Sequence, residues 1–387
     1  MKTNAEAVYI VGMGKCLPNA PVANDEMESV LGQVGRHASR ARRITLRNSG
    51  ILSRYYAIDP GTGQPTHTNA QMTAMAVRDA LARVNWRVGD LALLACGTST
   101  PDQIMPAHAH MVHGELGETP LEAISVAGVC SAGMAALKHA YLSVRTSDCS
   151  RAVSCGSELV SSFMAARNFT HEVLDNVVGA ARTPALAFEK DFLRWMLSDG
   201  AGAALVSNEP IAGRLALRID WIDGMSLAHE LPVCMYSGAV KHPDGTLRGW
   251  RNADSPEEMV RDDYLAIKQD ARLLDALITR LCTRDTLLAI AGRRGIAAHA
   301  IDWFLPHYSS EYFRSVLMDR LAALDFSIPE SRWFTNLSQV GNVGSASIYL
   351  MLEELMNSGR LERGQKLLCF VPESARFTVY YMQLTVV

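Results

Sequence analysis

The chain alternates short apolar runs with longer stretches of helical periodicity. Apolar runs such as VYIVGM (8–13), LALLACGTS (91–99) and RAVSCGS (151–157) are separated by stretches such as AQMTAMAVRDALARV (70–84). In the latter, apolar residues recur three or four positions apart, as on one face of a helix. Short buried strands joined by helices imply crossover connections. The pattern predicts an α/β protein built on a mostly parallel, buried sheet.

A weak internal duplication refines this prediction, because three pairs of segments share their order of elements. The pairs are residues 80–100 with 289–310, 128–144 with 341–356, and 150–158 with 365–374. We therefore expect two similar halves, residues 1–210 and 211–387, related by a pseudo-twofold axis. Ligands of open α/β sheets bind beyond the carboxyl ends of the strands. Both halves should thus contribute side chains to one cleft.

Composition narrows the class of protein. The chain has 387 residues, of which 48% are hydrophobic and 20% charged, so it can bury a large core. The 37 Lys and Arg residues nearly balance the 40 Asp and Glu residues, for a net charge of -3. This balance gives no general electrostatic reason to bind nucleic acid or an anionic membrane. We expect neither partner and no membrane span.

The cysteines indicate the compartment. The eight cysteines form no CxxC pair and follow no secretion signal, so we expect them to be reduced and the protein to be cytoplasmic. The histidines at 108, 110 and 113 have a metal-like composition, but residues two apart on a helix point in different directions. We expect no metal site.

Cys130 is the first candidate for chemistry. It lies in SVAGVCSAGMAAL, between an apolar strand and a helix of small residues. Free amide groups at a helix N-terminus favour a thiolate and can stabilise an oxyanion. This place suits an activated nucleophile, and the alternative is a buried structural cysteine.

His307 and Asn342 are the second and third candidates. His307 follows the apolar run IDWFLP, and Asn342 lies in SQVGNVGSAS, where the flanking glycines allow close approach of a ligand. An imidazole can transfer a proton, and both side chains can donate a hydrogen bond to a carbonyl oxygen. Each could instead be structural. The duplication favours a functional role, because it sets His307 across the pseudo-twofold axis from the half that carries Cys130.

A basic run lies near the N-terminus of this slightly acidic chain. It comprises Arg36, Arg40, Arg42, Arg43, Arg47 and Arg54. Such a run can bind the phosphates of coenzyme A or an acidic carrier protein, and the alternative is a solvated basic surface.

With Cys130, His307 and Asn342 in this order, the chain resembles the thiolase-fold condensing enzymes, most closely β-ketoacyl-acyl-carrier-protein synthase III. The likeness extends from VYIVGMGKCLP through VAGVCSAGMAAL and LSDGAGAALV to FLPHYSS and GNVGSAS. It implies a duplicated αβαβα architecture, a homodimer, acyl-coenzyme A or acyl-carrier-protein substrates and no permanently bound cofactor.

Within that family the chain resembles the StlD/DarB branch, which makes dialkylresorcinols and related cyclohexanediones. This finer likeness lies in segments such as SRARRITLRNSGILSRYYAID and GSELVSSFMAARNF. It implies that an acyl group is loaded on a cysteine, attacked by the α-carbon of a β-ketoacyl thioester, and that the product then closes into a ring.

The resemblance also implies a role for each residue. Cys130 would accept the acyl group, while His307 and Asn342 would hold the carbonyl of the second thioester. The backbone amides of Cys130 and Ala375 would stabilise the oxyanion. Five arginines would bind phosphopantetheine or the carrier protein: Arg47 and Arg54 first, then Arg36, Arg40 and Arg43.

Two segments depart from the synthase III pattern. PESARF (372–377) stands where a glycine-rich turn is expected, and His307 is followed by Tyr-Ser-Ser rather than Gln-Ala-Asn. The second change suggests a different second substrate or step.

Glu158, at the end of RAVSCGSE, is a further candidate, because a carboxylate with a raised pKa could remove a proton during ring closure. The alternative is a carboxylate that caps the next helix.

Three other functions fit parts of the sequence. A simpler synthase III would condense acyl-coenzyme A with malonyl-carrier protein and release a linear product. A non-catalytic partner of a ketosynthase would keep the fold but need none of the three residues. A cysteine hydrolase with Cys, His and Asn in that order would need a different fold and a different motif around Cys130.

Overall fold

A computed structural model describes residues 6–34, 40–169 and 193–387, except for the side chains of a few residues within helices. The N-terminal half contains these elements: β1 (Tyr9–Cys16), β2 (Val22–Ala23), α1 (Met27–Leu31), α2 (Arg40–Ser49), β3 (Ser53–Arg54), α3 (Asn69–Val84), η1 (Val88–Asp90), β4 (Leu93–Thr98), α4 (His108–Leu116), β5 (Glu122–Ala127), α5 (Ala132–Arg145), β6 (Arg151–Glu158), α6 (Ser161–Met164), η2 (Ala166–Phe169) and β7 (Gly200–Ser207).

The C-terminal half contains a second series. It comprises β8 (Leu217–Ser226), β9 (Met235–Tyr236), β10 (Ala239–Lys241), β11 (Leu247–Gly249), η3 (Trp250–Asn252), α9 (Pro256–Arg261), β12 (Lys268–Gln269), α10 (Ala271–Arg294), η4 (Ala298–Ala300), β13 (Trp303–Pro306), α11 (Tyr312–Ala322), η5 (Glu330–Arg332), α12 (Leu337–Val340), η6 (Gly344–Ala346), α13 (Ser347–Asn357), β14 (Lys366–Pro372) and β15 (Thr378–Val386). The predicted boundary at residue 210 falls in the connection between β7 and β8.

The strands repeat the duplication read from the sequence. The main sheet has the order β13-β14-β15-β8-β1-β7-β6-β4-β5. In the N-terminal half, β4 and β6 are parallel, and β7 and β1 then follow antiparallel. In the C-terminal half, β13 and β14 are parallel, and β15 and β8 then follow antiparallel. The counterpart of β5 is reduced to a single bridge between Phe304 and Trp333.

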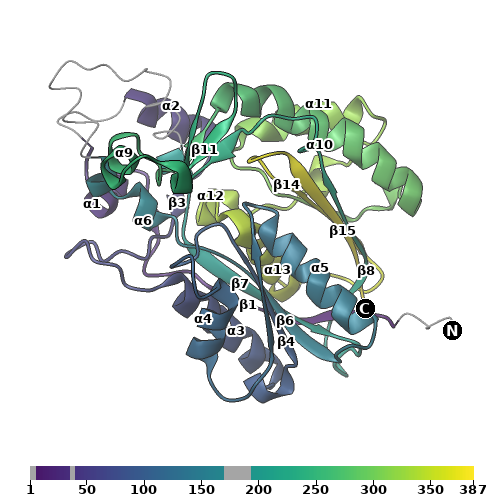
Figure 1. Cartoon of the computed structure of the whole chain (residues 1–387). Coiled ribbons are helices and arrows are strands. Elements are labelled where there is room, and N and C mark those ends of the chain that lie inside the picture. The colour runs from purple at the N-terminus through teal and green to yellow at the C-terminus, as the bar shows by residue number, and fades with distance from the viewer. Residues whose placement is uncertain (1–5, 35–39, 170–192) are drawn as a thin grey trace.

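The helices complete five layers. On the outside of the N-terminal strands, α3 and α4 share one apolar cluster with β4, β6 and β7. On the outside of the C-terminal strands, α10 and α11 pack against β13, β14 and β15. Figure 1 shows α5 and α13 between the two strand groups, where they share one core cluster. This is the duplicated αβαβα layering of the thiolase fold, as predicted.

The prediction of a mostly parallel sheet is wrong, because β7 and β15 each run antiparallel to both of their neighbours. The segment GAGAALVS of β7 is buried along its whole length. A strand buried on both faces shows no alternation, so its sequence resembles that of a parallel strand. The two strand groups are also joined, since β1 and β8 pair at Tyr9↔Arg218 and Ile10↔Leu217.

Candidate active site

One cavity lies beyond the carboxyl ends of the parallel strands of both halves. About 890 Å³ of space not filled by atoms lies within it, open solvent at its mouth included. Its polar lining includes Cys130, Glu158, His307 and Asn342, which approach from four separate segments of the chain. Much of the remaining wall is apolar, and comprises Val129, Val160, Leu193, Leu197, Met235, Ile267, Leu274, Ile278, Phe313, Leu317 and Phe370. The structure therefore brings the three predicted residues and the candidate Glu158 together beside an apolar chamber.

Cys130 lies between β5 and α5, two residues before Ala132, the first residue of the helix. This is the place that the sequence predicts. Its side chain is 7% exposed. Burial raises the pKa of its thiol well above the ordinary value, and the neighbouring carboxylates of Glu373 and Glu158 raise it further. The expectation that the helix N-terminus favours the thiolate is thus outweighed at this site, and the resting thiol is protonated.

We expect this protonated thiol to show in the pH dependence of its alkylation. Because the pKa is raised, the thiolate forms only in alkaline solution, and the rate with iodoacetamide should rise through a midpoint above the ordinary thiol value of about 8.5. Peptide mass spectrometry of Cys130 across the pH range measures the rate. A midpoint below about 7 would instead indicate that the helix N-terminus dominates.

His307 follows β13 directly and is 4% exposed. Its backbone N–H donates to the carbonyl of Phe370 on β14 at 2.8 Å, which fixes its place at the strand end. Burial lowers the pKa of the imidazole to about 4. The side chain is therefore neutral in neutral solution and acts as a hydrogen-bond donor or a proton acceptor rather than as a cation.

Asn342 lies between α12 and η6, and its backbone is anchored on both sides. Its N–H donates to the carbonyl of Met196 at 3.1 Å, and its own carbonyl accepts from the N–H of Ser198 at 2.9 Å. Its Oδ1 accepts the N–H of Gly344 at 3.0 Å. Because the acceptor of the amide is engaged in this way, the NH₂ group is the part that can serve a carbonyl oxygen in the cavity.

Glu158 ends β6 and is 1% exposed. Its carboxylate accepts the hydroxyl of Ser99 at 2.6 Å, the hydroxyl of Thr100 at 2.8 Å and the N–H of Ser345 at 3.1 Å. These donors come from both halves of the chain, and the carboxylate does not cap α6. Burial raises the pKa of Glu158, and the donors partly oppose that rise.

The small residues around Glu158 allow this close approach. Gly344 has a left-handed φ of 49°, and a Cβ there would lie 3.0 Å from the side chain of Glu158. A Cβ at Gly156 would lie 2.4 Å from the carbonyl of Ser345. Only glycine fits at these two points, so the GNVGSAS segment can lie against β6 and supply the N–H of Ser345.

The predicted oxyanion donor in the C-terminal half is wrong. The N–H of Ala375 donates to Glu373 Oε1 at 2.6 Å, so it is not available to a ligand. Glu373 follows β14 and is 5% exposed. Burial raises its pKa, and the backbone N–H groups that it accepts oppose that rise. The replacement of a glycine-rich turn by PESARF explains the difference, because the glutamate binds the amides of its own turn.

Glu373 was not predicted as a site residue, although the sequence contains a signal for it. The duplicated segments 150–158 and 365–374 each end a strand with a glutamate. Glu158 and Glu373 occupy these equivalent positions at the ends of β6 and β14. The donors to Glu158 at Ser99, Thr100 and Ser345 were also missed, since serine and threonine are common in turns and carry no distinctive pattern.

The predicted basic residues fall into three groups. Arg43 and Arg47 are exposed on α2. Arg54 is fully buried, and its guanidinium donates to Asn24 Oδ1 at 2.5 Å and to the carbonyl of Trp195 at 3.2 Å. The prediction that Arg54 binds a phosphate is therefore wrong, because the guanidinium is shielded from solvent and two of its nitrogens donate within the protein. Arg36 lies outside the described residues, as does the side chain of Arg40.

The histidines of α4 do not converge on one point. His108 is buried, and its Nε2 lies 3.1 Å from Ser157 Oγ, whereas Nε2 of His113 lies 2.9 Å from the carbonyl of Thr119. No group of His, Cys, Asp or Glu suited to holding a metal occurs in residues 6–34, 40–169 and 193–387. Within the same ranges, no helix has both the length and the apolar character needed to cross a membrane. The seven cysteines whose side chains are described are free.

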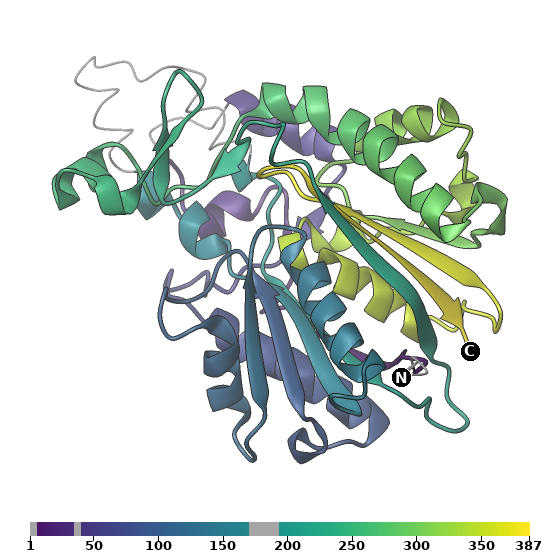
Figure 2. The same ribbon diagram turned by 45° about the vertical axis from the view of Figure 1, so that its right-hand side comes forward.

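Residues 227–270, here called the cap, form a wall of the cavity. Its polar stretch 240–258 has the Gly, Pro and Asp content typical of a surface loop, and it contains most of the hairpin β10–β11 and the start of α9. Figure 2 shows the cap projecting from the layered core at the upper left. Met235, Ile267 and Gln269 of the cap line the cavity, so the cap helps to shape the site and is more than surface decoration.

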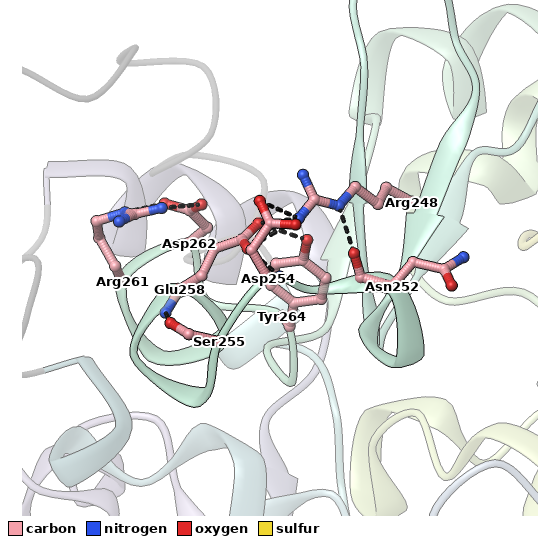
Figure 3. Close-up of polar contacts among 8 residues, drawn as sticks. All are labelled: Arg248, Asn252, Asp254, Ser255, Glu258, Arg261, Asp262 and Tyr264. Carbon is pink, nitrogen blue, oxygen red and sulfur yellow. Dashed lines mark hydrogen bonds and ion pairs between the residues drawn. The ribbon is translucent and has the colours of Figure 1, made fainter.

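A polar cluster holds the outer part of the cap together (Figure 3). Arg248 lies 2.8 Å from Glu258 and 3.2 Å from Asp254, and its Nε donates to the carbonyl of Asn252 at 2.9 Å. The hydroxyl of Tyr264 donates to Glu258 at 3.0 Å. The N–H of Asp254 is the main cause of the lowered pKa of Glu258. The cluster keeps the hairpin and α9 in one arrangement over the inner cap residues.

Known proteins that resemble this chain are condensing enzymes. Residues 292–371 match the family model for the 3-oxoacyl-[acyl-carrier-protein (ACP)] synthase III C terminal, a range that contains His307 and Asn342. The β-ketoacyl-[acyl-carrier-protein] synthase III of Xanthomonas oryzae pv. oryzae is 26% identical over 361 residues, which cover 93% of this chain and 92% of that relative. The synthase III of Rhizorhabdus wittichii is 25% identical over 360 residues, 92% of this chain and 93% of the relative.

Solved structures share the fold. The tetronic acid condensing enzyme AbyA1 superposes with a TM-score of 0.72 at 21% identity, over 98% of this chain and 99% of that one. A variant of OleA from Xanthomonas campestris, solved with lauric acid and lauroyl-CoA, has a TM-score of 0.74 at 18% identity over the same shares. The fold, the matched C-terminal segment and the full-length synthase relatives together show a thiolase-fold condensing enzyme similar to β-ketoacyl-ACP synthase III, and hence an acyltransferase.

Proposed function

We propose that this enzyme loads an acyl group on Cys130, joins it by a Claisen-type condensation to a β-ketoacyl thioester, and closes the product to a cyclohexanedione or dialkylresorcinol-type ring. The observation that carries the proposal is that Cys130, His307, Asn342 and Glu158 line one apolar cavity. The first three residues suit any condensing enzyme of this fold. Glu158 adds a buried carboxylate that can accept a proton.

In the loading step, the sulfur of Cys130 attacks the thioester carbonyl of an acyl-coenzyme A or acyl-carrier protein. The bond from that carbonyl to the donor's sulfur breaks, and the thiol proton of Cys130 ends on the departing thiolate. Because the resting thiol is protonated, this proton must move as the sulfur attacks. The neutral imidazole of His307 can carry it. The apolar wall would hold the acyl chain, as supported by the fatty acyl ligands in the OleA structure.

In the condensation step, the second thioester places its carbonyl oxygen against His307 and the NH₂ group of Asn342. Hydrogen bonds there stabilise the enolate that forms when the α-carbon loses its proton. The α-carbon then attacks the acyl carbonyl on Cys130, and the sulfur leaves and regains a proton.

Ring closure requires an α,β-unsaturated acyl group. The γ-carbon of the former β-ketoacyl unit loses a proton and adds to the β-carbon of the acyl C=C bond, whose α-carbon takes up a proton, so a cyclohexanedione forms with no leaving group. A dialkylresorcinol forms from that ring only by a separate two-electron oxidation. Glu158 is our candidate to remove the α-proton or the γ-proton, as the likeness to the StlD/DarB branch suggests.

A decarboxylative synthase III is the second candidate, and the synthase III relatives favour it. There, loss of carbon dioxide from malonyl-carrier protein generates the carbanion, so no base is needed and the product is a linear β-ketoacyl thioester. The buried carboxylate in the cavity favours the first candidate. The third candidate, a non-catalytic ketosynthase partner, has no use for the assembled Cys130, His307 and Asn342.

One experiment separates the three. The purified protein is acylated with an α,β-unsaturated medium-chain acyl-coenzyme A or acyl-carrier protein, then mixed with either a 3-oxoacyl or a malonyl thioester, and the products are identified by mass spectrometry. A cyclised product from the 3-oxoacyl thioester supports the proposal. A linear product from the malonyl thioester alone supports decarboxylative condensation, and absence of acylation with every donor supports the non-catalytic partner.

We also propose that Arg43 and Arg47 of α2 bind the phosphate of coenzyme A or the acidic carrier protein, because both are exposed. The double charge reversal Arg43→Glu with Arg47→Glu should raise KM for the acyl donor about tenfold and leave kcat nearly unchanged. Steady-state acylation at low salt measures the effect. Arg363→Glu is the control, because Arg363 is exposed before β14 begins, at the opposite end of that strand from the cavity. An equal KM in both variants would contradict the proposal.

A homodimer is part of the proposed assembly. In the main sheet, β5 is an edge strand, and its residues Ile124 and Val126 are only partly buried. An apolar edge strand is a ready site for pairing with a second chain. Pairing through β5 would continue the sheet across two copies and cover this edge.

A further inference from the structure

Glu373 is a buried carboxylate next to the site for which the condensing chemistry gives no role. Its nearest hydrogen bonds are to its own turn: it accepts the N–H of Ala375 at 2.6 Å, of Arg376 at 3.3 Å and of Thr378 at 3.2 Å. Its own N–H donates to the carbonyl of Thr378 at 2.7 Å. Three bonds to the carboxylate and one between backbone groups thus close residues 373–378, here called the β14–β15 turn.

The β14–β15 turn needs this support. Phe377 has a left-handed φ of 61° and is fully buried, which is a sparsely populated conformation for a bulky side chain. The carboxylate binds the N–H groups of the residues on both sides of Phe377. Removing the charge should therefore let the turn relax toward a more common backbone conformation.

The turn also holds the cap. The carbonyl of Ala375 accepts the N–H of Cys234 at 2.8 Å and of Met235 at 3.2 Å. Both polar groups of the Ala375 backbone are thus engaged, the N–H by Glu373 and the carbonyl by the cap. The backbone of Ala375 is consequently fixed, and its N–H is not free to bind a ligand.

Ser374 is the member of the turn that lines the cavity. Its hydroxyl oxygen accepts a hydrogen bond from Gln269 Nε2 of the cap at 3.0 Å. The hydrogen of its own hydroxyl is not used in that bond and can be donated to a carbonyl oxygen in the cavity. Ser374 is therefore placed to do what the resemblance assigned to the amide of Ala375.

We propose that Glu373 is a positioning residue for acyl transfer, which fixes the β14–β15 turn so that the hydroxyl of Ser374 faces the thioester carbonyl at Cys130. This inference rests on the proposed function, since it concerns the oxyanion formed when Cys130 attacks a thioester. The carboxylate itself touches no substrate. Its effect passes through the backbone of the turn and through its charge near Cys130.

The test compares two reactions of the same thiol in the variant Glu373→Gln. Alkylation by iodoacetamide needs the thiolate but no oxyanion donor, whereas acylation by an acyl-coenzyme A needs both. Loss of the negative charge should move the alkylation midpoint to lower pH. Loss of the turn's geometry should slow acylation about tenfold to a hundredfold. The two reactions should therefore change in opposite directions.

Two further variants make the result specific. Ser374→Ala should slow acylation about tenfold or more and leave the alkylation midpoint in place. Glu353→Gln is the matched control, because Glu353 is a buried carboxylate of the same half that pairs with Lys15 and Arg83 outside the cavity. It should change neither reaction.

The outcomes separate this inference from the proposed function. If the wild-type enzyme is not acylated by any thioester, the proposed function fails and the role of Glu373 fails with it. If the wild-type enzyme is acylated and Glu373→Gln is acylated at the same rate, only the positioning role fails. A parallel loss of both reactions together with a lower melting temperature would show a purely structural residue and overturn the proposal, as would wild-type acylation of Ser374→Ala.

Discussion

Replacing Cys130 by alanine is expected to abolish acyl loading. The cavity offers Cys130 as its only thiol among the residues described, so no other lining side chain can form the thioester. With a medium-chain acyl-coenzyme A, the wild-type chain should gain the mass of one acyl group, and Cys130→Ala should gain none. Intact-mass spectrometry measures the gain, and peptide mapping places it.

The matched control is Cys149→Ala. Cys149 is partly exposed and lies outside the cavity, so it is an accessible thiol without the surrounding site. This variant should be acylated like the wild type. If Cys130→Ala is still acylated, on another cysteine, then the acyl donor reacts with any exposed thiol. That result would refute the assignment of Cys130 as the nucleophile.

Replacing Glu158 by glutamine is expected to leave loading nearly intact and to slow condensation with a 3-oxoacyl thioester about a hundredfold, or about 2.7 kcal/mol in the barrier. The amide keeps the shape of the carboxylate but cannot take a proton. Ser99, Thr100 and Ser345 all donate hydrogen bonds to Glu158, so the Oε1 of glutamine can still accept some of these bonds. Product formation after pre-acylation of Cys130 measures the second step alone.

The comparison with Glu353→Gln controls for the loss of a buried carboxylate elsewhere, and that variant should condense at the wild-type rate. A second variant, Glu158→Asp, keeps the acid group and should recover part of the activity. If Glu158→Gln still forms the cyclised product at the wild-type rate, the carboxylate is not the base. If loading and condensation fall together, its role is to hold β6 against η6.

Much of the site could be predicted from the sequence because the duplication sets its main residues at equivalent strand ends. Cys130 and Asn342 each precede one of the two central helices, and His307 follows β13 in the place that Ser99 takes after β4. The repeated order of strands and helices in the two halves therefore predicted that Cys130, His307 and Asn342 lie close together. The same order contained Glu158 and Glu373, but one glutamate at a strand end is too common to indicate a role without its contacts.

Two of the errors in the site have a different origin, since each concerns the bonding partner of a single polar group. Arg54 belongs to a basic run, yet its guanidinium turns inward to Asn24 and the carbonyl of Trp195. The amide of Ala375 lies in the expected turn, but the carboxylate of Glu373, two residues earlier, accepts its hydrogen bond. Residue type and spacing indicate where the backbone goes. They do not reveal which of several nearby acceptors a donor will choose.

The shared central layer ties the two halves into one folding unit. Tyr349 of α13 donates its hydroxyl to the carbonyl of Gly133 on α5 at 2.8 Å and lies 2.8 Å from Ser154 Oγ of β6. A Cβ at Gly133 would lie 2.9 Å from the ring of Tyr349, so α5 and α13 meet with almost no space between them. Neither half could bury α5 or α13 without the other. A chain cut between β7 and β8 should therefore yield two fragments that stay unfolded apart and regain structure only when mixed.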